Sequence, residues 1–455
     1  MEGVTATVLQ GIEVEYVGAR LGDRRLEYRL PKMAVALAAE PTKSLPKAMP
    51  VEAALEGAYR LLRNRAVTAD GILEGHYEET LKRAAGRRRV IAIHDTTIFE
   101  FDGDEEREGL GPLRGKGQGF LGHFVLLAAV DDPVMPLGVL AMDAVVRPKG
   151  KKPADAEKES QRWHRALATA RNRLADQHVV HVMDREADKY HLLAALVDAG
   201  DSFVIRAVHD RLVCPQIYLS DVLATASTVV ERTVVLAKRK KKEALSAKQS
   251  AREGRTARLA ISAVRTIVPR SKGTDKSLPD HLSVNIVHVR EVDPPPGCEP
   301  VDWRLLTSEP IRKPSDLEHI VDLYRARWLI EEFFKSIKTG CDYESRQMES
   351  LHTLLNTLAL LIPIAWRLLL LRTLARQTPD IPATKALTKA QLAILGKRRY
   401  GALPKGATVR QAMMSVARMG GHIRHNGEPG WIVLGRGFHD LVRLEEGWLA
   451  AKEDI

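Results

Sequence analysis

Two short apolar runs, each leading into an aspartate, stand out in the hydrophobic pattern of the chain. Residues 88–97 carry aliphatic residues up to Asp95, and residues 178–188 repeat the pattern up to Asp184. Short β-branched runs bounded by polar residues are typical of buried strands. We therefore expect two buried strands, with Asp95 at the C-terminal edge of the first and Asp184 directly after the second.

Further apolar runs predict the rest of a mixed α/β core. Residues 120–132 and 134–146 read as two strands joined by a hairpin-like turn at 131–133. Helical patterns follow at 156–176 and 190–199, and a strand follows at 202–206.

After residue 209 the pattern changes to short β-rich runs, among them 227–237 and 282–292. The basic run 238–242 lies between them, and the proline-rich stretch 293–297 is a stiff linker that follows the β-rich region. We interpret this region as an inserted, basic β subdomain.

Residues 315–340 predict a long amphipathic helix. Ser315 and Glu318 have the spacing of a capping box, and Gly340 is a typical stop. One stripe is apolar, and we expect it to face the core: Leu323, Ala326, Ile330, Phe334 and Ile337.

A second stripe of this helix carries an aromatic ring, two cations and a carboxylate: Tyr324, Arg327, Glu331 and Lys338. On a continuous helix these side chains fall within about 60° of one another. A carboxylate flanked by cations suits phosphodiester chemistry, since the acid can hold a metal and the cations can hold phosphates. A solvated helix edge is the alternative for this stripe taken alone.

Composition favours a folded protein with an anionic partner. The chain has 455 residues, 45% of them hydrophobic, and a net charge of +11. These values predict two or three domains, or one with an insertion, and nucleic acid before a membrane surface as partner. In the mainly helical first 85 residues, Arg24, Arg25 and Arg60 belong to clusters that either contact phosphate or form a solvated face.

Several classes are disfavoured. The three cysteines never form a C-x-x-C pair, which argues against a disulfide framework or a cysteine-rich zinc site and favours a reducing cytosol. We find no signal-peptide pattern and no nucleotide-binding glycine loop. The longest apolar run, 358–366, is interrupted by Pro363 and reads as a buried helix.

Asp95, Asp184 and Glu331 together suggest a metal site. Ligands gather at the C-terminal edge of central strands in open sheets. Three carboxylates there repel one another unless cations intervene, and Mg²⁺ prefers oxygen ligands of this kind. For each residue taken singly, the favoured explanation is structural: an Asx turn for Asp95, and for Asp184 a cap of helix 190–199 or of the turn before it.

The stretches 93–97 (IHDTT), 182–188 (VMDREAD), 302–310 (DWRLLTSEP) and 324–340 (YRARWLIEEFFKSIKTG) resemble DDE transposases of the IS4 type, most closely the Tn5 (IS50) group. The resemblance implies an α/β fold: an RNase H-like mixed-sheet core, a β-rich insertion, and helical N- and C-terminal domains. The expected parts are an N-terminal DNA-binding domain at 1–85, core segments at 86–208 and 301–345, the insertion at 209–300, and a C-terminal, dimerising domain at 346–455.

The resemblance also implies roles for single residues. Asp95, Asp184 and Glu331 would be the catalytic triad that binds two Mg²⁺ ions, with Mn²⁺ as a substitute. Family members nick DNA at transposon ends, form and reopen a hairpin, and join the free 3′-OH to target DNA. The residues expected to contact DNA are Tyr324, Arg327, Lys338, Arg206 and Trp303, with Arg24, Arg25 and Arg60 in the N-terminal domain. Trp303 would stack on an extruded base, and Val208 replaces a family cation.

The leading hypothesis is a cut-and-paste transposase, acting as a homodimer on paired double-stranded ends in the bacterial cytoplasm, without membrane or nucleotide cofactor. Two alternatives stay open: a non-catalytic DNA-binding regulator derived from a transposase, and an RNase H-like nuclease without strand transfer.

Overall fold

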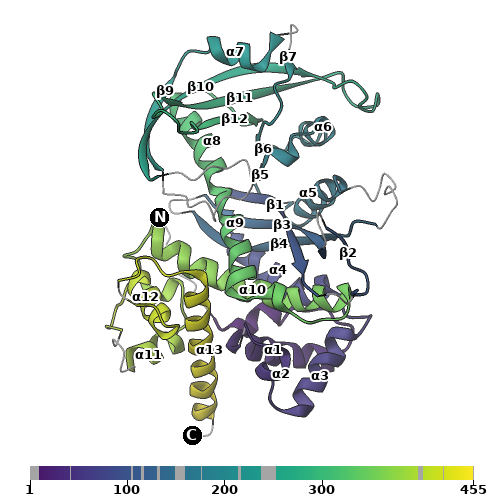
Figure 1. The fold of residues 1–455 in the computed structure, drawn as a ribbon, viewed down its shortest axis with the longest axis vertical. Helices are drawn as coiled ribbons and strands as arrows, with labels where there is room; N and C mark the ends of the chain where they lie inside the picture. Colours follow the sequence, from purple (N-terminus) through teal and green to yellow (C-terminus); the bar gives the residue numbers. More distant parts are fainter. Residues whose placement is uncertain are drawn as a thin grey trace. The chain divides into compact units, whose positions relative to one another are not determined.

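The computed structural model separates into two compact units (Figure 1). Unit 1 comprises Met1–Val90, Asp95–His178 and Trp328–Ile455, and unit 2 comprises Ile91–His94 and Val179–Arg327. The structure describes residues 10–40, 42–103, 106–113, 117–130, 134–148, 159–175, 177–213, 217–236, 253–397, 403–423 and 425–453. The predicted turn at 131–133 and the basic run 238–242 lie outside these residues.

Unit 1 begins with helices, as the sequence predicts for its first 85 residues. A 3-10 helix, η1 (Ile12–Tyr16), precedes α1 (Arg24–Ala39), α2 (Leu45–Ala48), α3 (Glu52–Arg63) and α4 (Ala69–Ala84). Local capping explains where two of them start. Asp23 accepts the Arg25 N–H at the start of α1, and Thr68 accepts the Gly71 N–H at the start of α4.

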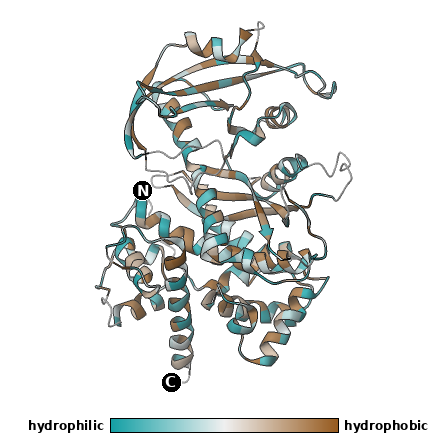
Figure 2. Ribbon diagram, viewed as in Figure 1, coloured by the Kyte–Doolittle hydropathy of each residue, from teal (hydrophilic) through white to brown (hydrophobic). Residues whose placement is uncertain are grey.

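The sheet of unit 1 is built around β3 (Gln118–Ala129), which is buried along nearly its whole length. It pairs antiparallel with β4 (Met135–Val145) and with the short β2 (Gly111–Pro112), and β1 (Val90–Phe101) is its other neighbour. Helices α4 and α10 (Leu351–Gln377) pack on β4, and α5 (Gln161–Arg173) packs on β3 and β4. Figure 2 shows the hydrophobic residues gathered along these strands.

Helix α10 is the central helix of unit 1. Its 27 residues are long and apolar enough to cross a membrane, but 94% of its most apolar window is buried inside the protein. It is therefore a core helix, as predicted. The helix continues through Pro363, whose missing N–H leaves one turn without its hydrogen bond but does not end the helix.

The C-terminal part of unit 1 is helical, as predicted. It contains α11 (Lys389–Lys397), α12 (Val409–Met419) and α13 (Trp431–Glu453). Helix α13 packs against α12, α11 and α1, so the end of the chain contacts its helical beginning.

Unit 2 has a mixed sheet. The Ile91–His94 part of β1 lies beside β5 (Val179–Met183), which pairs parallel with β6 (Ser202–Arg206). Four antiparallel strands follow in the order β12 (Asp302–Thr307), β11 (His281–Val292), β10 (Arg255–Pro269) and β9 (Val230–Leu236). Strands β9, β10 and β11 of the inserted region thus extend the sheet of β5 and β6.

Helices and two short strands complete unit 2. Helix α6 (Tyr190–Asp198) packs on β11, α7 (Leu219–Thr225) on β10, and α8 (Pro314–Ala326) on several strands, β5 and β6 among them. Strands β7 (Leu212–Val213) and β8 (Ile217–Tyr218) form a separate pair. The expected mixed α/β class is confirmed: the protein has a mixed sheet, β-rich strands in the inserted region and helical ends.

Two local predictions were wrong. Strand β1 continues to Phe101, so Asp95 lies in its middle and not at its C-terminal edge. The residues after Asp95 are largely β-branched or aromatic, which favours continuation of the strand. The helix cap is also displaced. Asp316, not Ser315, caps α8, because its carboxylate accepts the N–H groups of Arg312 and Lys313 at 2.8 and 3.1 Å.

The helix predicted for residues 315–340 is not continuous. Helix α8 ends at Ala326, α9 spans Trp328–Lys335, and a π-helix, η5, spans Ser336–Gly340. The Cys341 N–H reaches the Ser336 carbonyl at 2.9 Å, a spacing of five residues. Tyr324 lies on α8, Glu331 on α9 and Lys338 on the π-helix, so the single charged stripe stays a prediction. The apolar partner stripe is buried as expected.

Candidate active site

Asp95 lies half-buried in the part of β1 that belongs to unit 1. Its Oδ1 atom accepts the backbone N–H of Thr96 at 2.8 Å. This bond goes to the next residue within the strand, and not two residues on as in the Asx turn that was the alternative explanation for Asp95. This bond occupies one of about four acceptor sites of the carboxylate.

A hydrogen-bond chain fixes the residue beside Asp95. The Arg162 Nε–H donates to the Thr96 hydroxyl at 2.8 Å, and that hydroxyl lies 2.8 Å from Nδ1 of His123. The hydroxyl can accept from Arg162 and donate its own proton to Nδ1. We assign this direction, which places the proton of the neutral His123 ring on Nε2. Burial, together with the nearby Arg162 and Arg165, holds the pKa of His123 well below its usual range, in agreement with a neutral ring.

Glu331 lies half-buried on α9, in the same unit as Asp95. Seven residues later, the Lys338 ammonium donates to the Ile98 carbonyl and pairs with Glu344 at 3.0 Å. It also lies 5.3 Å from the centre of the Phe99 ring. Since Ile98 and Phe99 follow Asp95 in β1, these contacts tie the helical segment after Glu331 to the strand of Asp95.

Asp184 follows β5 directly, as predicted, and is half-buried in unit 2. Its Oδ1 atom accepts the Glu186 N–H at 2.8 Å and so caps the short 3-10 helix η3 (Arg185–Ala187). Capping, the alternative explanation for Asp184, is thus one of its contacts. The capping bond orients the carboxylate.

Three predicted DNA-contacting residues lie together in unit 2. The rings of Trp303 and Tyr324 meet edge to face, with centres 5.4 Å apart and planes at 68°. The Arg327 guanidinium lies 5.9 Å from the centre of the Tyr324 ring. Trp303 is half-buried at the start of β12, whereas Tyr324 is buried. The tryptophan therefore keeps exposed ring surface, and the tyrosine supports it.

Electrostatics place Asp184 and Arg206 close to the Tyr324 hydroxyl. Burial is the largest cause that raises the pKa of Tyr324, and the negative charge of Asp184 also raises it. The positive charges of Arg327 and Arg206 act in the opposite direction. Arg206 also donates to the Asp302 carbonyl at 3.1 Å. The structure thus brings five predicted residues together in unit 2: Asp184, Arg206, Trp303, Tyr324 and Arg327.

The position expected to carry a further cation lies beside this cluster. Val208 is exposed, and its N–H donates to the buried Asp188 at 2.8 Å. Asp188 also accepts from Arg211. The segment after β6 is therefore anchored by Asp188, a contact for which the sequence showed no spacing signal.

The donor set suits a hard divalent ion, since all three predicted ligands are carboxylates. Asp95 and Glu331 belong to unit 1 and Asp184 to unit 2. Over the described residues, no group of three or more His, Cys, Asp or Glu side chains lies in a position to hold a metal ion. The assignment of these residues as metal ligands stays a prediction.

The predicted N-terminal cations lie on the surface. Arg24 and Arg25 line an open cavity of about 520 Å³ on α1, together with Tyr28, Arg29 and Lys32. Arg25 pairs with Asp23 at 2.9 Å, and Arg60 pairs with Glu56 on α3. Four cations on one helix surface are suited to phosphate contact.

The sequence interpretation missed Arg162 and His123. Neither belongs to a motif, and each reaches Thr96 only through the fold. A signal was present for His123, because a histidine within an apolar run of twelve buried or half-buried residues needs a polar partner.

Comparison with known families identifies the domains. Residues 11–67 match the family described as transposase DNA-binding, and residues 143–366 match the family described as transposase DDE domain. These two segments are thus similar to the DNA-binding and DDE domains of transposases. Asp184, Trp303, Tyr324, Arg327 and Glu331 all lie within the DDE match, whereas Asp95 precedes it.

A solved structure of a piggyBac transposase synaptic complex with hairpin DNA is similar to this chain at 9% sequence identity. The similarity covers 93% of this chain and 76% of that one, with a TM-score of 0.37. A TM-score of this size supports no conclusion on function.

Proposed function

We propose that the protein is a cut-and-paste DNA transposase of the IS4 type, in the Tn5 group, that cleaves transposon ends and joins them to target DNA. The observation that carries this proposal is the cluster around Tyr324 within the DDE domain. There a carboxylate, two arginines and an exposed tryptophan surface gather: Asp184, Arg206, Arg327 and Trp303.

The cluster suits a DNA end with an extruded base. Hairpin closure needs a terminal base to leave the stack, which costs a few kcal/mol. The half-exposed Trp303 ring offers a stacking surface of about 1–3 kcal/mol per base. Tyr324 fixes that ring from its edge, and Arg206 and Arg327 supply the positive charge that the flanking phosphates require.

Asp95, Asp184 and Glu331 would hold two Mg²⁺ ions, or Mn²⁺ in their place. Such ions activate the attacking oxygen and stabilise the leaving oxygen. The protein orients two of these ligands by its own contacts: the Thr96 N–H holds Asp95, and the Glu186 N–H holds Asp184.

The domain limits proposed from the sequence give each part a task. Residues 1–85 bind the transposon end, where Arg24, Arg25 and Arg60 are exposed. The core segments 86–208 and 301–345 cleave, the insertion 209–300 contacts DNA, and the helices of 346–455 pair two copies on paired ends. We place this activity in the bacterial cytoplasm, on the nucleoid.

Incubation of the protein with duplex DNA of the flanking inverted repeats and Mg²⁺ tests the proposal. A denaturing gel separates nicked, hairpin and joined products. We expect all three in succession, and none in EDTA. Nicked products that never become hairpins or joined DNA would establish the nuclease alternative, and binding without any cleavage would establish the regulator.

A further inference from the structure

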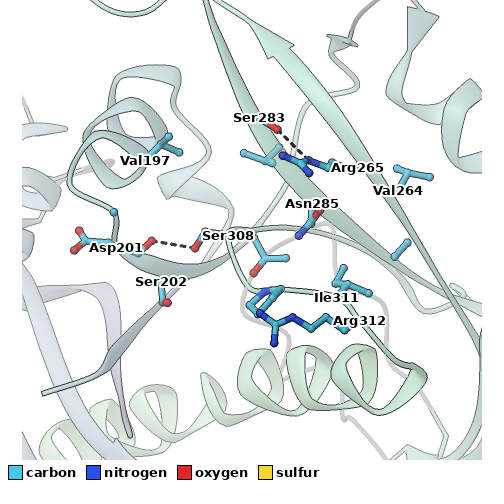
Figure 3. Close-up of a pocket in the computed structure, with 15 residues that line it drawn as sticks. Val197, Asp201, Ser202, Val264, Arg265, Ser283, Asn285, Ser308, Ile311 and Arg312 are labelled. Atoms are coloured by element: carbon cyan, nitrogen blue, oxygen red, sulfur yellow. Dashed lines mark hydrogen bonds between the residues drawn. The ribbon is translucent and has the colours of Figure 1, made fainter.

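Unit 2 contains an open cavity of about 630 Å³ that none of the predicted site residues lines. Figure 3 shows its labelled lining residues, which come from the end of α6, from β10 and β11, and from the segment before α8. Two arginines, Arg265 and Arg312, face one acidic residue, Asp201, among the lining residues. In the view of Figure 3 the Asp201 carboxylate lies on the side away from both arginines.

The cavity lies at the opposite end of its strands from the Tyr324 cluster. Ser202 begins β6 and lines the cavity, whereas Arg206 ends β6 at the cluster. Likewise Thr307 at the end of β12 lines the cavity, and Trp303 lies near its start. Four residues of strand separate the two ends by about 13 Å. A ligand here is therefore distinct from the DNA end at the cluster.

The floor of the cavity is rigid, because its polar side chains bond to the backbone. The Ser308 hydroxyl donates to the Asp201 carbonyl at 2.9 Å and accepts the Phe203 N–H at 3.0 Å. The Thr307 hydroxyl donates to the Phe203 carbonyl at 2.6 Å, and the Asn285 amide donates to the Glu309 carbonyl at 2.8 Å. These bonds leave the two guanidinium groups as the main donors to a ligand.

Among the residues that the structure describes, neither arginine forms a salt bridge with an acidic side chain, unlike other arginines of β10. Arg255 pairs with Glu291 at 2.7 Å, and Arg258 pairs with Asp293 at 3.2 Å. Arg265 reaches only the Ser283 hydroxyl, at 3.3 Å. The side chain of Arg312 makes no hydrogen bond or ion pair with any residue that the structure describes. Its backbone is nevertheless held by Asp316, so its position is set before a ligand arrives.

We propose that Arg265 and Arg312 form a phosphate-binding pocket that takes a backbone phosphate of DNA outside the cleavage cluster. Guanidinium groups bind phosphate oxygens in a two-pronged geometry that an ammonium group lacks. The cavity is open and both arginines are exposed, so a phosphate within a polymer can reach them. The excess of positive charge on the chain, +11, favours the same partner.

Fluorescence anisotropy with labelled inverted-repeat duplex, recorded in EDTA from 50 to 200 mM salt, tests this pocket. The test variant carries R265Q and R312Q together, and R258Q is the matched control. Arg258 lies seven residues before Arg265 on the same strand, so its side chain lies on the opposite face of the sheet. We expect the double variant to bind roughly tenfold more weakly and its salt slope to fall by about 0.9, while R258Q stays within about twofold of wild type.

Because a phosphate contact carries no sequence information, an unrelated duplex of equal length should lose affinity by the same factor. Equal binding by the double variant and R258Q would overturn the proposal. So would a stabilisation by inorganic phosphate that disappears in the double variant without any change in DNA affinity, since the pocket would then serve a free phosphate ligand.

The proposal rests on the DNA-binding part of the proposed function alone. Binding in EDTA needs no cleavage, so a failure of the metal chemistry leaves this measurement intact. If wild-type protein does not bind the duplex, the proposed function fails first; if it binds and the double variant binds equally, only the pocket fails.

Discussion

Replacement of Thr96 by valine tests the hydrogen-bond chain beside Asp95. Valine keeps the shape of threonine and keeps the N–H that holds Asp95, but it removes the hydroxyl. The buried Arg162 then loses an acceptor, and His123 loses a donor. A lost bond to a charged group costs about 1.5–3 kcal/mol and a neutral one about 0.5–1.5 kcal/mol.

We therefore expect Thr96→Val to lower the free energy of unfolding by about 2–4 kcal/mol. Thr96→Ser is the control, since it keeps the hydroxyl and loses one methyl group, at about 0.8 kcal/mol. Urea unfolding followed by tryptophan fluorescence measures both. Trp163 is a local reporter, because its ring centre lies 4.6 Å from that of His123.

The comparison of the two variants decides the outcome. If valine and serine destabilise unit 1 equally, the hydroxyl contributes nothing and the assigned direction of the chain is wrong. Cleavage by Thr96→Val, normalised to folded protein, should persist, because the backbone bond to Asp95 remains. Its complete loss at full folding would contradict the inference that the backbone N–H orients the carboxylate.

Four further predictions address other parts of the molecule. Asp184→Ala should abolish cleavage while DNA affinity in EDTA stays within about threefold, measured by gel and anisotropy; retained cleavage would refute its role as a metal ligand. Trp303→Ala should permit nicking but reduce hairpin products roughly tenfold on a denaturing gel, and normal hairpins would contradict base stacking. Lys338→Ala should weaken DNA binding with a salt slope reduced by about 0.9 if it contacts phosphate, and should leave binding unchanged if its bonds to Ile98 and Glu344 are its whole role. Glu15→Gln should lower the free energy of unfolding by about 3–5 kcal/mol at pH 7 in urea titrations, because Arg83 and Arg367 lose their buried partner.

Glu15 also sets a pH dependence. Burial alone would raise the pKa of its carboxyl, but Arg83, His76 and Arg367 hold that pKa well below its ordinary range. The folded protein therefore binds this proton less readily than the unfolded chain. The stabilisation is present at neutral pH and is lost as the pH falls below about 4.3. Wild type should lose stability through that range, and Glu15→Gln should lose less.

Much of the secondary structure was predictable because buried elements appear in the sequence as continuous hydrophobic runs. The run before Asp184 ends as β5 at Met183, and the predicted strand at 202–206 is β6 without a change of limits. The apolar run around 358–366 became the middle of the buried α10. In each case the continuous run of hydrophobic residues marks an element that the rest of the protein covers on all sides.

Predictions that depended on element ends were less successful. The position of Asp95 within β1 depends on the strand continuing toward Phe101, whose burial comes from packing against distant aromatic residues such as Phe120 and Tyr343. The helix predicted as continuous over 315–340 is interrupted after Ala326 and ends in the π-helix Ser336–Gly340. A π-helical turn inserts one residue into the helical repeat, which spacing alone does not reveal.

The sequence by itself determined the residue types of this protein's chemistry: three carboxylates, an aromatic pair, and cations at the spacing of a known family. Tertiary structure alone decided which of them meet. Trp303 reaches Tyr324 because β12 and α8 pack in one unit, and Thr96 connects to Arg162 across 66 residues of chain. Long-range contacts of this kind form when elements distant in sequence pack together and buried polar groups need hydrogen-bond partners. The local pattern of residues does not show which elements will meet.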